Sequence, residues 1–285
     1  DAVDRCFMGN GLAINYPNSG YDETGFGAVE NHCYDPDYKD KKTDQNISNM
    51  YANREPRFYA SVVYQGRSWF KKWMNGNPNY IVDFSAGGGN DLSNGDNVKT
   101  GYMLGKFKNR TVNHASGDTQ SWKRVSIIYR LAEFYLFYAE ALNETDPSNP
   151  DIIKYIDMVR ERAGIPGYQT MNDNGIKTGI IGNYDKQFDA IQHERYVELY
   201  CEGQRYFDIR RWMICGDKDR IGCDQTRFYG MNMKGSKDKT PGEPTSYYTR
   251  TKVENRQWTD KLYLYPIHQN VIELANGRIP QNYGW

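Results

Sequence analysis

Three glutamates recur at four-residue intervals in the segment 185–214: Glu194, Glu198 and Glu202. On a helix this spacing places their carboxylates on one face. Two carboxylates about 5–9.5 Å apart are the groups that cleave a glycosidic bond, so a catalytic pair is the first chemistry to weigh. Side chains four residues apart on one helix project in parallel, however, and cannot flank a sugar from opposite sides. We therefore predict no catalytic residues in this segment.

Arginines accompany these glutamates on both sides of Gly203, which divides the segment into a longer and a shorter helix. Like charges on one helix face repel each other unless cations lie close by. We interpret the charged residues as a buried network of charge-assisted hydrogen bonds that holds the two helices together. The structural set comprises Glu194, Arg195, Glu198, Arg205 and Asp208.

A second candidate site is the aromatic-rich segment 64–80, in which rings alternate with amides and cations. A ring can stack on the C–H face of a sugar while amides and guanidinium groups bind its hydroxyls. In a helix Trp69 and Trp73 would share one face, which fits a core equally well, so both interpretations stay open. If these rings belong to the core, Tyr16, Tyr21, Tyr34 or the segment 225–258 is the alternative platform. The candidate ligand-binding residues are Trp69, Trp73, Tyr34, Tyr80, Arg67 and Asn75.

Other chemical signatures are missing from the sequence. It contains five cysteines without a CxxC pair and four well-separated histidines, and it has no GxSxG, Walker or HExxH motif. We therefore predict no metal site and no cofactor. Cys215 and Cys223 could form a disulfide across a loop, and the odd cysteine count is also compatible with free thiols.

The elements that position these residues are mostly helical. The segment 127–144 is apolar around most of a helix, which predicts burial on more than one face. A second helix starts at Pro150 after the capping residue Asn149 and ends at Gly164. Two amphipathic helices joined by a short loop form an antiparallel pair of the tetratricopeptide type, and one such pair needs neighbours to bury both faces.

Composition limits the class of protein. The 36 basic and 36 acidic residues give a formal net charge of zero, which disfavours non-specific electrostatic binding to nucleic acid. No apolar run approaches the length of a membrane helix. Residues 1–120 are rich in Gly, Asn, Asp and Tyr and predict loops with a few short strands, whereas 121–285 predict a helical region. The two parts together favour a mainly α fold with long irregular loops and a few short strands, built as one domain.

Seven sequence blocks, in order, resemble the SusD/RagB family of nutrient-binding outer-membrane lipoproteins. Glu55, Cys201 and His268 depart from the residues usual in that family. The blocks are VDRCFMGNGLAI (3–14), NREPRFYASVVYQG (53–66), TGYMLGKF (100–107), YRLAEFYLFYAEALNE (129–144), VRERAGIP (159–166), HERYVELYCEGQRYFDIRRW (193–212) and LYPIHQNVIELANGRIPQNYGW (264–285).

This resemblance implies a SusD-like fold and a non-enzymatic protein that binds a glycan at the cell surface. It also implies a SusC-like TonB-dependent transporter as partner, a lipid anchor on an upstream Cys, and an N-terminal half with further helix pairs, so that the domain continues upstream. The alternatives are a SusD-like binder of a peptide or another nutrient, and a glycoside hydrolase on a helical scaffold.

Overall fold

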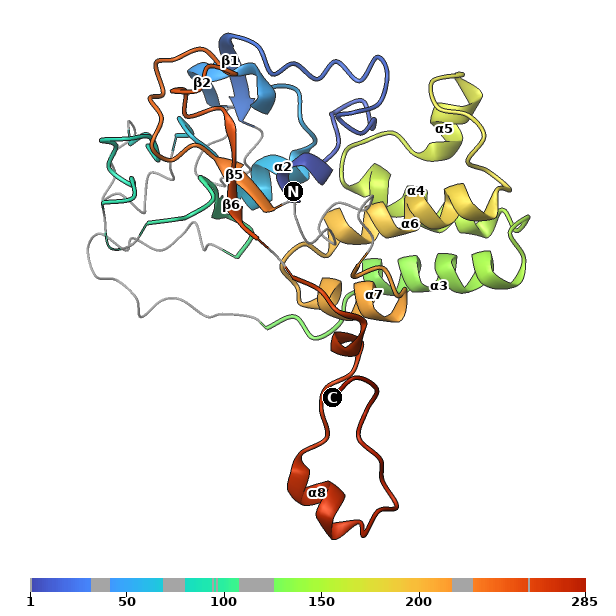
Figure 1. The fold of residues 1–285 in the computed structure, drawn as a ribbon. Coiled ribbons are helices and arrows are strands. Elements are labelled where there is room, and N and C mark those ends of the chain that lie inside the picture. The colour runs from blue at the N-terminus through green and yellow to red at the C-terminus, as the bar shows by residue number, and fades with distance from the viewer. Residues whose placement is uncertain are drawn as a thin grey trace.

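A computed structural model describes most of the chain, and the fold is mainly helical with a few short strands, as predicted. In Figure 1, helices α3, α4 and α6 lie side by side, the short strands lie at the opposite side of the body, and the segment with α8 projects away from both. The described residues are 2–31, 42–68, 80–93, 95, 97–107, 126–216, 228–255 and 257–285.

The helical layer is built around α3 (Leu131–Thr145), which packs against α4 (Asp151–Arg162) and α6 (Tyr184–Glu198). The short connection makes α3 and α4 an antiparallel pair, which confirms the predicted helix hairpin. The short α5 (Tyr168–Asp173) contacts α4. The buried residues of this layer are Leu12, Ala132, Leu136, Ala139, Ile152, Ile153, Ile156, Val159, Tyr168, Met171, Ile180, Ala190 and Ile191.

Local signals set the ends of α4 and the break at Gly203 where the sequence predicts them, whereas α3 begins at Leu131, four residues later than expected. The Asn149 side chain accepts a hydrogen bond from the Asp151 backbone N–H at 3.0 Å, at the start of α4. Gly164 follows that helix with a φ of +83°, a conformation that favours glycine. Gly203, with a φ of +90°, lies between α6 and α7 (Gln204–Arg211) and lets the chain change direction there.

α3 differs from the expectation that it would be buried on more than one face. Small and polar side chains such as Ala132, Ala139 and Asn143 point into the helical layer. The large apolar residues Leu131 and Phe134 are instead 63% and 55% exposed. α4 and α6 bury one side of α3, and within this structure its second apolar side remains at the surface.

Among the described residues, the strand region consists of three two-stranded antiparallel ribbons. β1 (Phe26–Asn31) pairs with β2 (Lys42–Ser48), β3 (Val62–Val63) with β4 (Met103–Leu104), and β5 (Phe228–Met231) with β6 (Arg250–Glu254). The remaining described elements here are α1 (Ala2–Arg5), a 3-10 turn at Asn49–Tyr51 and α2 (Pro56–Ser61). Ribbons this short are not stable alone, so side-chain packing must hold them together.

That packing is a core rich in aromatic rings. Tyr51 and Tyr64 stack with ring centroids 4.6 Å apart, and Phe58 stacks on Tyr64 at 5.6 Å. Met231 and Tyr247 belong to the same core, so the segment 228–255 packs with the loop-rich first region. A core built largely from tyrosine rings explains how a chain with few aliphatic residues can fold, because buried tyrosines keep their hydroxyls hydrogen-bonded.

The last part of the chain, 257–285, forms an arm that contains a 3-10 turn at Asp260–Tyr263 and the short α8 (Gln269–Leu274). None of its residues is buried. It extends beyond the body in Figure 1. Among the described residues, no helix is long and apolar enough to cross a bilayer.

Candidate functional site

The predicted charge cluster lies at the junction of the two regions, with Glu194 at its centre. Glu194 is fully buried on α6. One of its carboxylate oxygens accepts from Arg57 of α2 at 2.5 Å and the other from Arg160 of α4 at 3.2 Å. The glutamate therefore ties α6 to two other helices, and both of its oxygens are occupied.

Glu198, one turn further along α6, carries three ion pairs. Its carboxylate accepts from Arg57 at 2.9 Å and also from Arg130 and Arg162. Burial alone would raise the pKa of Glu198, but the three guanidinium groups outweigh it and lower that pKa to about 2. Glu198 is consequently ionised at neutral pH and has no proton to donate.

Glu202 completes the row of carboxylates after α6 has ended. Lys106 donates to it at 2.5 Å and the Arg130 Nε at 2.6 Å. Lys106 also donates to the backbone carbonyls of Glu198 and Tyr200. Burial lowers the pKa of Lys106, although Glu202 opposes this change. These contacts fix the turn that leads to Gly203.

Arg195 and Asp208 provide the predicted connection across Gly203. Two parallel hydrogen bonds of 2.9 Å join the Arg195 guanidinium on α6 to the Asp208 carboxylate on α7, and both side chains are buried. A bidentate pair of this kind fixes both distance and orientation. Arg211 then links α7 to Glu140 of α3.

Other members of the predicted set have different partners from those expected. Glu194 and Glu198 bind the arginines of α2, α4 and the segment before α3, and not an arginine beyond Gly203. Arg205 lies over the ring of Tyr196, with its guanidinium carbon 4.4 Å from the ring centroid. The expected pairing of the two glutamates with Arg205 is therefore wrong, because the side of α6 that carries Glu194 and Glu198 faces α2 and α4. Arg205 of α7 still contacts α6, through the Tyr196 ring.

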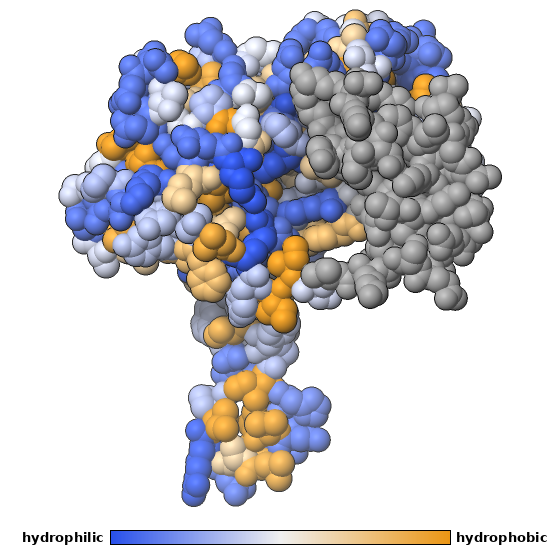
Figure 2. Space-filling model, turned by 180° about the vertical axis from the view of Figure 1, so that it is seen from behind, coloured by the Kyte–Doolittle hydropathy of each residue, from blue (hydrophilic) through white to orange (hydrophobic). Residues whose placement is uncertain are grey.

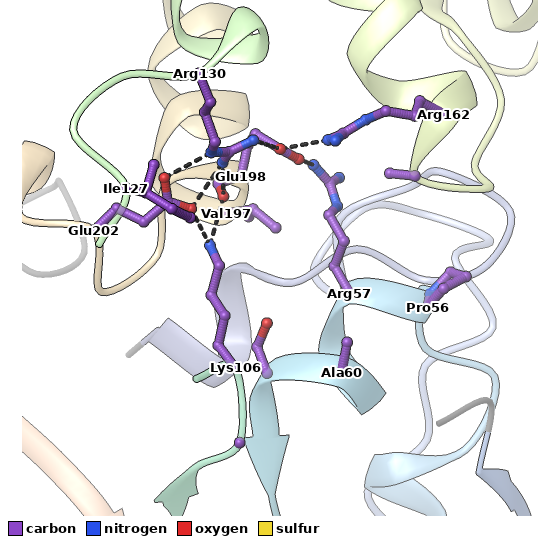
Figure 3. Close-up of a pocket in the computed structure, with 13 residues that line it drawn as sticks. Pro56, Arg57, Ala60, Lys106, Ile127, Arg130, Arg162, Val197, Glu198 and Glu202 are labelled. Carbon is purple, nitrogen blue, oxygen red and sulfur yellow. Dashed lines mark hydrogen bonds and ion pairs between the residues drawn. The ribbon is translucent and has the colours of Figure 1, made fainter. Parts of the chain in front are cut away.

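A pocket of about 620 Å³ opens beside this network. Figure 3 shows the ends of Arg57, Arg130 and Arg162 converging on Glu198, while Lys106 reaches Glu202 from below. The wall combines apolar residues with paired charges, and its four cations outnumber its two carboxylates, Glu198 and Glu202. With both Glu198 and Glu202 held by cations, these carboxylates lack the free acid and base that hydrolysis requires.

The predicted ligand-binding residues fall mostly outside the described residues: Trp69, Trp73, Asn75 and Tyr34. Tyr80 is half-buried, and its hydroxyl donates to Asn90 at 3.5 Å. Arg67 is buried, and it donates to the Val62 carbonyl at 2.5 Å. Its predicted role as a surface partner for sugar hydroxyls is therefore wrong, because the side chain packs within the core.

Two further expectations concern sulfur and metal ligands. Burial raises the pKa of the Cys6 thiol to about 12, so this cysteine is a core residue. Cys215, which follows α7, is buried, whereas Cys223 lies outside the described residues. In the described part of the chain, no three His, Cys, Asp or Glu side chains gather as a metal site would require.

Sequence periodicity did not identify the cations of the network, because they come from segments far from α6. A signal for them was nevertheless present. Every cation bound to the three glutamates lies inside one of the family-like blocks quoted above, and those blocks converge at this junction. The cations are Arg57, Lys106, Arg130, Arg160 and Arg162.

The architecture is that of a helical scaffold joined through buried charges to a loop-rich region. A family model for the SusD family matches residues 1–285, so the chain belongs to that family. The curated SusD-like protein P2 of Formosa agariphila is 37% identical over 82 residues, which are 29% of this chain and 16% of that protein.

Solved structures agree with this assignment. A SusD-like protein of Bacteroides fragilis is 26% identical with a TM-score of 0.70, and the match covers all of this chain and 46% of that one. BT4246 is 25% identical with a TM-score of 0.70, over 99% of this chain and 43% of that one. The chain therefore spans less than half the length of these solved relatives.

Proposed function

We propose that the protein is a non-catalytic glycan-binding protein of the cell surface. The observation that carries this proposal is membership of the SusD family over all 285 residues. In this proposal the protein is anchored to the outer membrane by a lipid on an upstream Cys and delivers an oligo- or polysaccharide to a SusC-like TonB-dependent transporter. No cofactor is needed, because binding requires only stacking surfaces and hydrogen bonds.

The glycan surface in this proposal is the segment around Trp69 and Trp73, with Tyr34, Tyr80 and Asn75 as further contacts. The loops on either side of that segment are anchored in the aromatic core: Tyr64 is fully buried before it, and Val82 and Phe84 are buried after it. Binding residues are commonly presented on loops held by a rigid scaffold. Buried flanks on both sides support this position for the ligand platform.

One experiment separates binding from catalysis. The protein is run through native gels that contain different polysaccharides, and the same polysaccharides are assayed for new reducing ends. We expect retardation in at least one gel without release of reducing ends. Release of reducing ends would instead identify a glycoside hydrolase. Failure to bind any glycan on an array, with binding of peptides or another nutrient, would replace glycan by that ligand.

The exposed side of α3 supports an additional part of the proposal, an N-terminal half that packs on the helix pair. Leu131, Phe134 and Tyr138 are exposed at i, i+3 and i+7, the spacing by which one helix packs on another. Residues 1–285 on their own should therefore bind a hydrophobic dye or aggregate. A monomer that melts cooperatively without binding dye would contradict an upstream half at this face.

A further inference from the structure

The arm formed by 257–285 is ordered without having a core of its own. Hydrogen bonds between side chains and backbone hold its two sides together. The Gln281 amide accepts from the Ile267 N–H at 2.8 Å and donates to the Ile267 carbonyl at 2.9 Å. The Trp285 indole N–H donates to the carbonyls of Lys261 and Leu264, at 3.0 Å each. The arm therefore has a fixed shape that no internal hydrophobic packing explains.

The base of the arm is attached to the body. The Tyr263 hydroxyl accepts from the Cys215 backbone N–H at 3.0 Å, just after α7. Tyr265 and Tyr206 of α7 are joined through their hydroxyls. Because its base is fixed, the arm is held in a set position relative to the helical layer and is not a tail that hangs free (Figure 1).

Beyond this base the arm presents apolar side chains to the surroundings. Leu274 of α8 is 83% exposed, and Val271, one turn before it, is also exposed. Ile279 on the returning side adds to the same element. Figure 2 shows that hydrophobic residues gather on one face of the projecting segment. An ordered element that exposes its apolar residues is typical of a surface that another part of a protein covers.

We propose that this arm clamps onto an upstream half of the same polypeptide, so that its apolar face is buried there. The solved relatives supply the argument for this occupant. The family model continues through the arm to residue 285, and the chain accounts for only 46% and 43% of the two solved relatives. A partner in the same polypeptide is present at high effective concentration, which favours it over a second copy or a separate protein. This inference rests on the upstream half proposed above.

The test compares hydrogen–deuterium exchange of the arm in two forms, residues 1–285 alone and the same chain with its upstream region. We expect amides of 267–279 to exchange quickly in the short form and at least tenfold more slowly in the long form. Equal exchange rates in both forms would overturn the proposal. Slow exchange in the short form would also overturn it: with a dimeric mass it would indicate a second copy, and with a monomeric mass an arm packed on its own body.

A matched pair of variants in the long form keeps the proposal testable if the short form aggregates. Leu274→Asp should open the arm to limited proteolysis at least tenfold faster than wild type, because it places a charge in the proposed interface. Arg278→Asp introduces the same side chain at an exposed polar position of the same arm and should change nothing. Equal cleavage of the two variants would refute the docking. Glycan retention of the wild-type long form is measured separately, so a failure to bind glycan leaves the result on the arm unaffected.

Discussion

The helical region and the loop-rich region both bury polar side chains, but they do so with different chemistry. In the helical region the buried groups are charges: Arg160, Glu194, Arg195 and Asp208 are all nearly inaccessible. In the loop-rich region a few charges such as Arg54 and Glu55 are buried as well, but they lie among phenols such as Tyr51, whose hydroxyl bonds that of Tyr102 at 3.3 Å. A buried charge depends strongly on its partners, whereas a phenol needs only one neutral hydrogen bond.

This difference separates two tasks within one chain. The charge network fixes how α2, α4, α6 and α7 meet, since each pairing allows few orientations. Contacts between aromatic rings depend less on orientation than ion pairs do, so the aromatic core can hold loops of many shapes. We therefore expect single polar substitutions to damage the helical junction most, and substitutions in the loops to alter ligand binding with little effect on folding.

The largest expected effect is on the junction itself. Glu198→Ala should lower the free energy of unfolding by about 3–5 kcal/mol, because Arg57 and Arg130 lose a carboxylate partner in a buried site. Denaturant unfolding measures this loss. Glu161→Ala, at an exposed position of α4, is the control, with an expected change below about 0.5 kcal/mol. Unchanged stability of the Glu198 variant would show that the network does not hold the helices.

How far the sequence anticipates the molecule also differs between the two regions. Helix periodicity and capping residues predicted α3, α4 and the break at Gly203 because those signals are local. The partners of Glu194 could not be found in this way, since Arg57 lies 137 residues away. The aromatic core was equally hidden, because Tyr51, Tyr64 and Tyr247 come from segments without a periodic pattern. The burial of Arg67 was not predicted for the same reason, because it depends on which loops surround this side chain.

The second prediction concerns acid sensitivity, which should arise in the helical region. His193 of α6 is stacked on Phe7, and burial, helped by Arg5, Lys177 and Arg160, lowers its pKa from 6.5 to about 3. The unfolded chain therefore takes up a proton first as the pH falls below 6.5. The stabilisation from neutral His193 is complete above pH 6.5 and is lost progressively between pH 6.5 and 3. Between pH 7.5 and 5 the loss should be about 2 kcal/mol.

His193→Gln isolates this contribution, since the variant has no imidazole to protonate. Unfolding free energies of wild type and variant are compared at pH 7.5 and 5, and the variant should lose about 2 kcal/mol less over that interval. Glu55 and Glu198 also titrate in acid, but they are present in both proteins and cancel in the difference. His268→Gln, at an exposed position, should follow the wild type. Equal losses of unfolding free energy in wild type and His193→Gln would exclude His193 as a source of acid sensitivity.

The third prediction tests the loop-rich region as the ligand platform. Trp73→Ala should weaken glycan binding at least tenfold, about 1.4 kcal/mol, with little loss of stability. Calorimetry with the best glycan from the array measures the affinity, and Tyr283→Ala removes an exposed ring elsewhere as control. Normal binding, or an unfolded variant, would place Trp73 in the core. The platform would then have to be sought at Tyr16, Tyr21, Tyr34 or in 225–258.

The smallest expected effect comes from the outer edge of the charge network. Arg162 binds Glu198, yet its side chain is 58% exposed, whereas Arg160, two residues earlier, is fully buried. Arg162→Gln should therefore cost less than about 1 kcal/mol, because water screens the pair and Glu198 keeps Arg57 and Arg130. Arg160→Gln should cost several times more, since it leaves Glu194 with one cation in a dry site. Denaturant unfolding of both variants, at low and high salt, measures the contrast, and only the small Arg162 effect should shrink with salt. Equal losses would mean that burial does not determine the strength of these pairs, and the distinction between a charged core and its solvated edge would have to be abandoned.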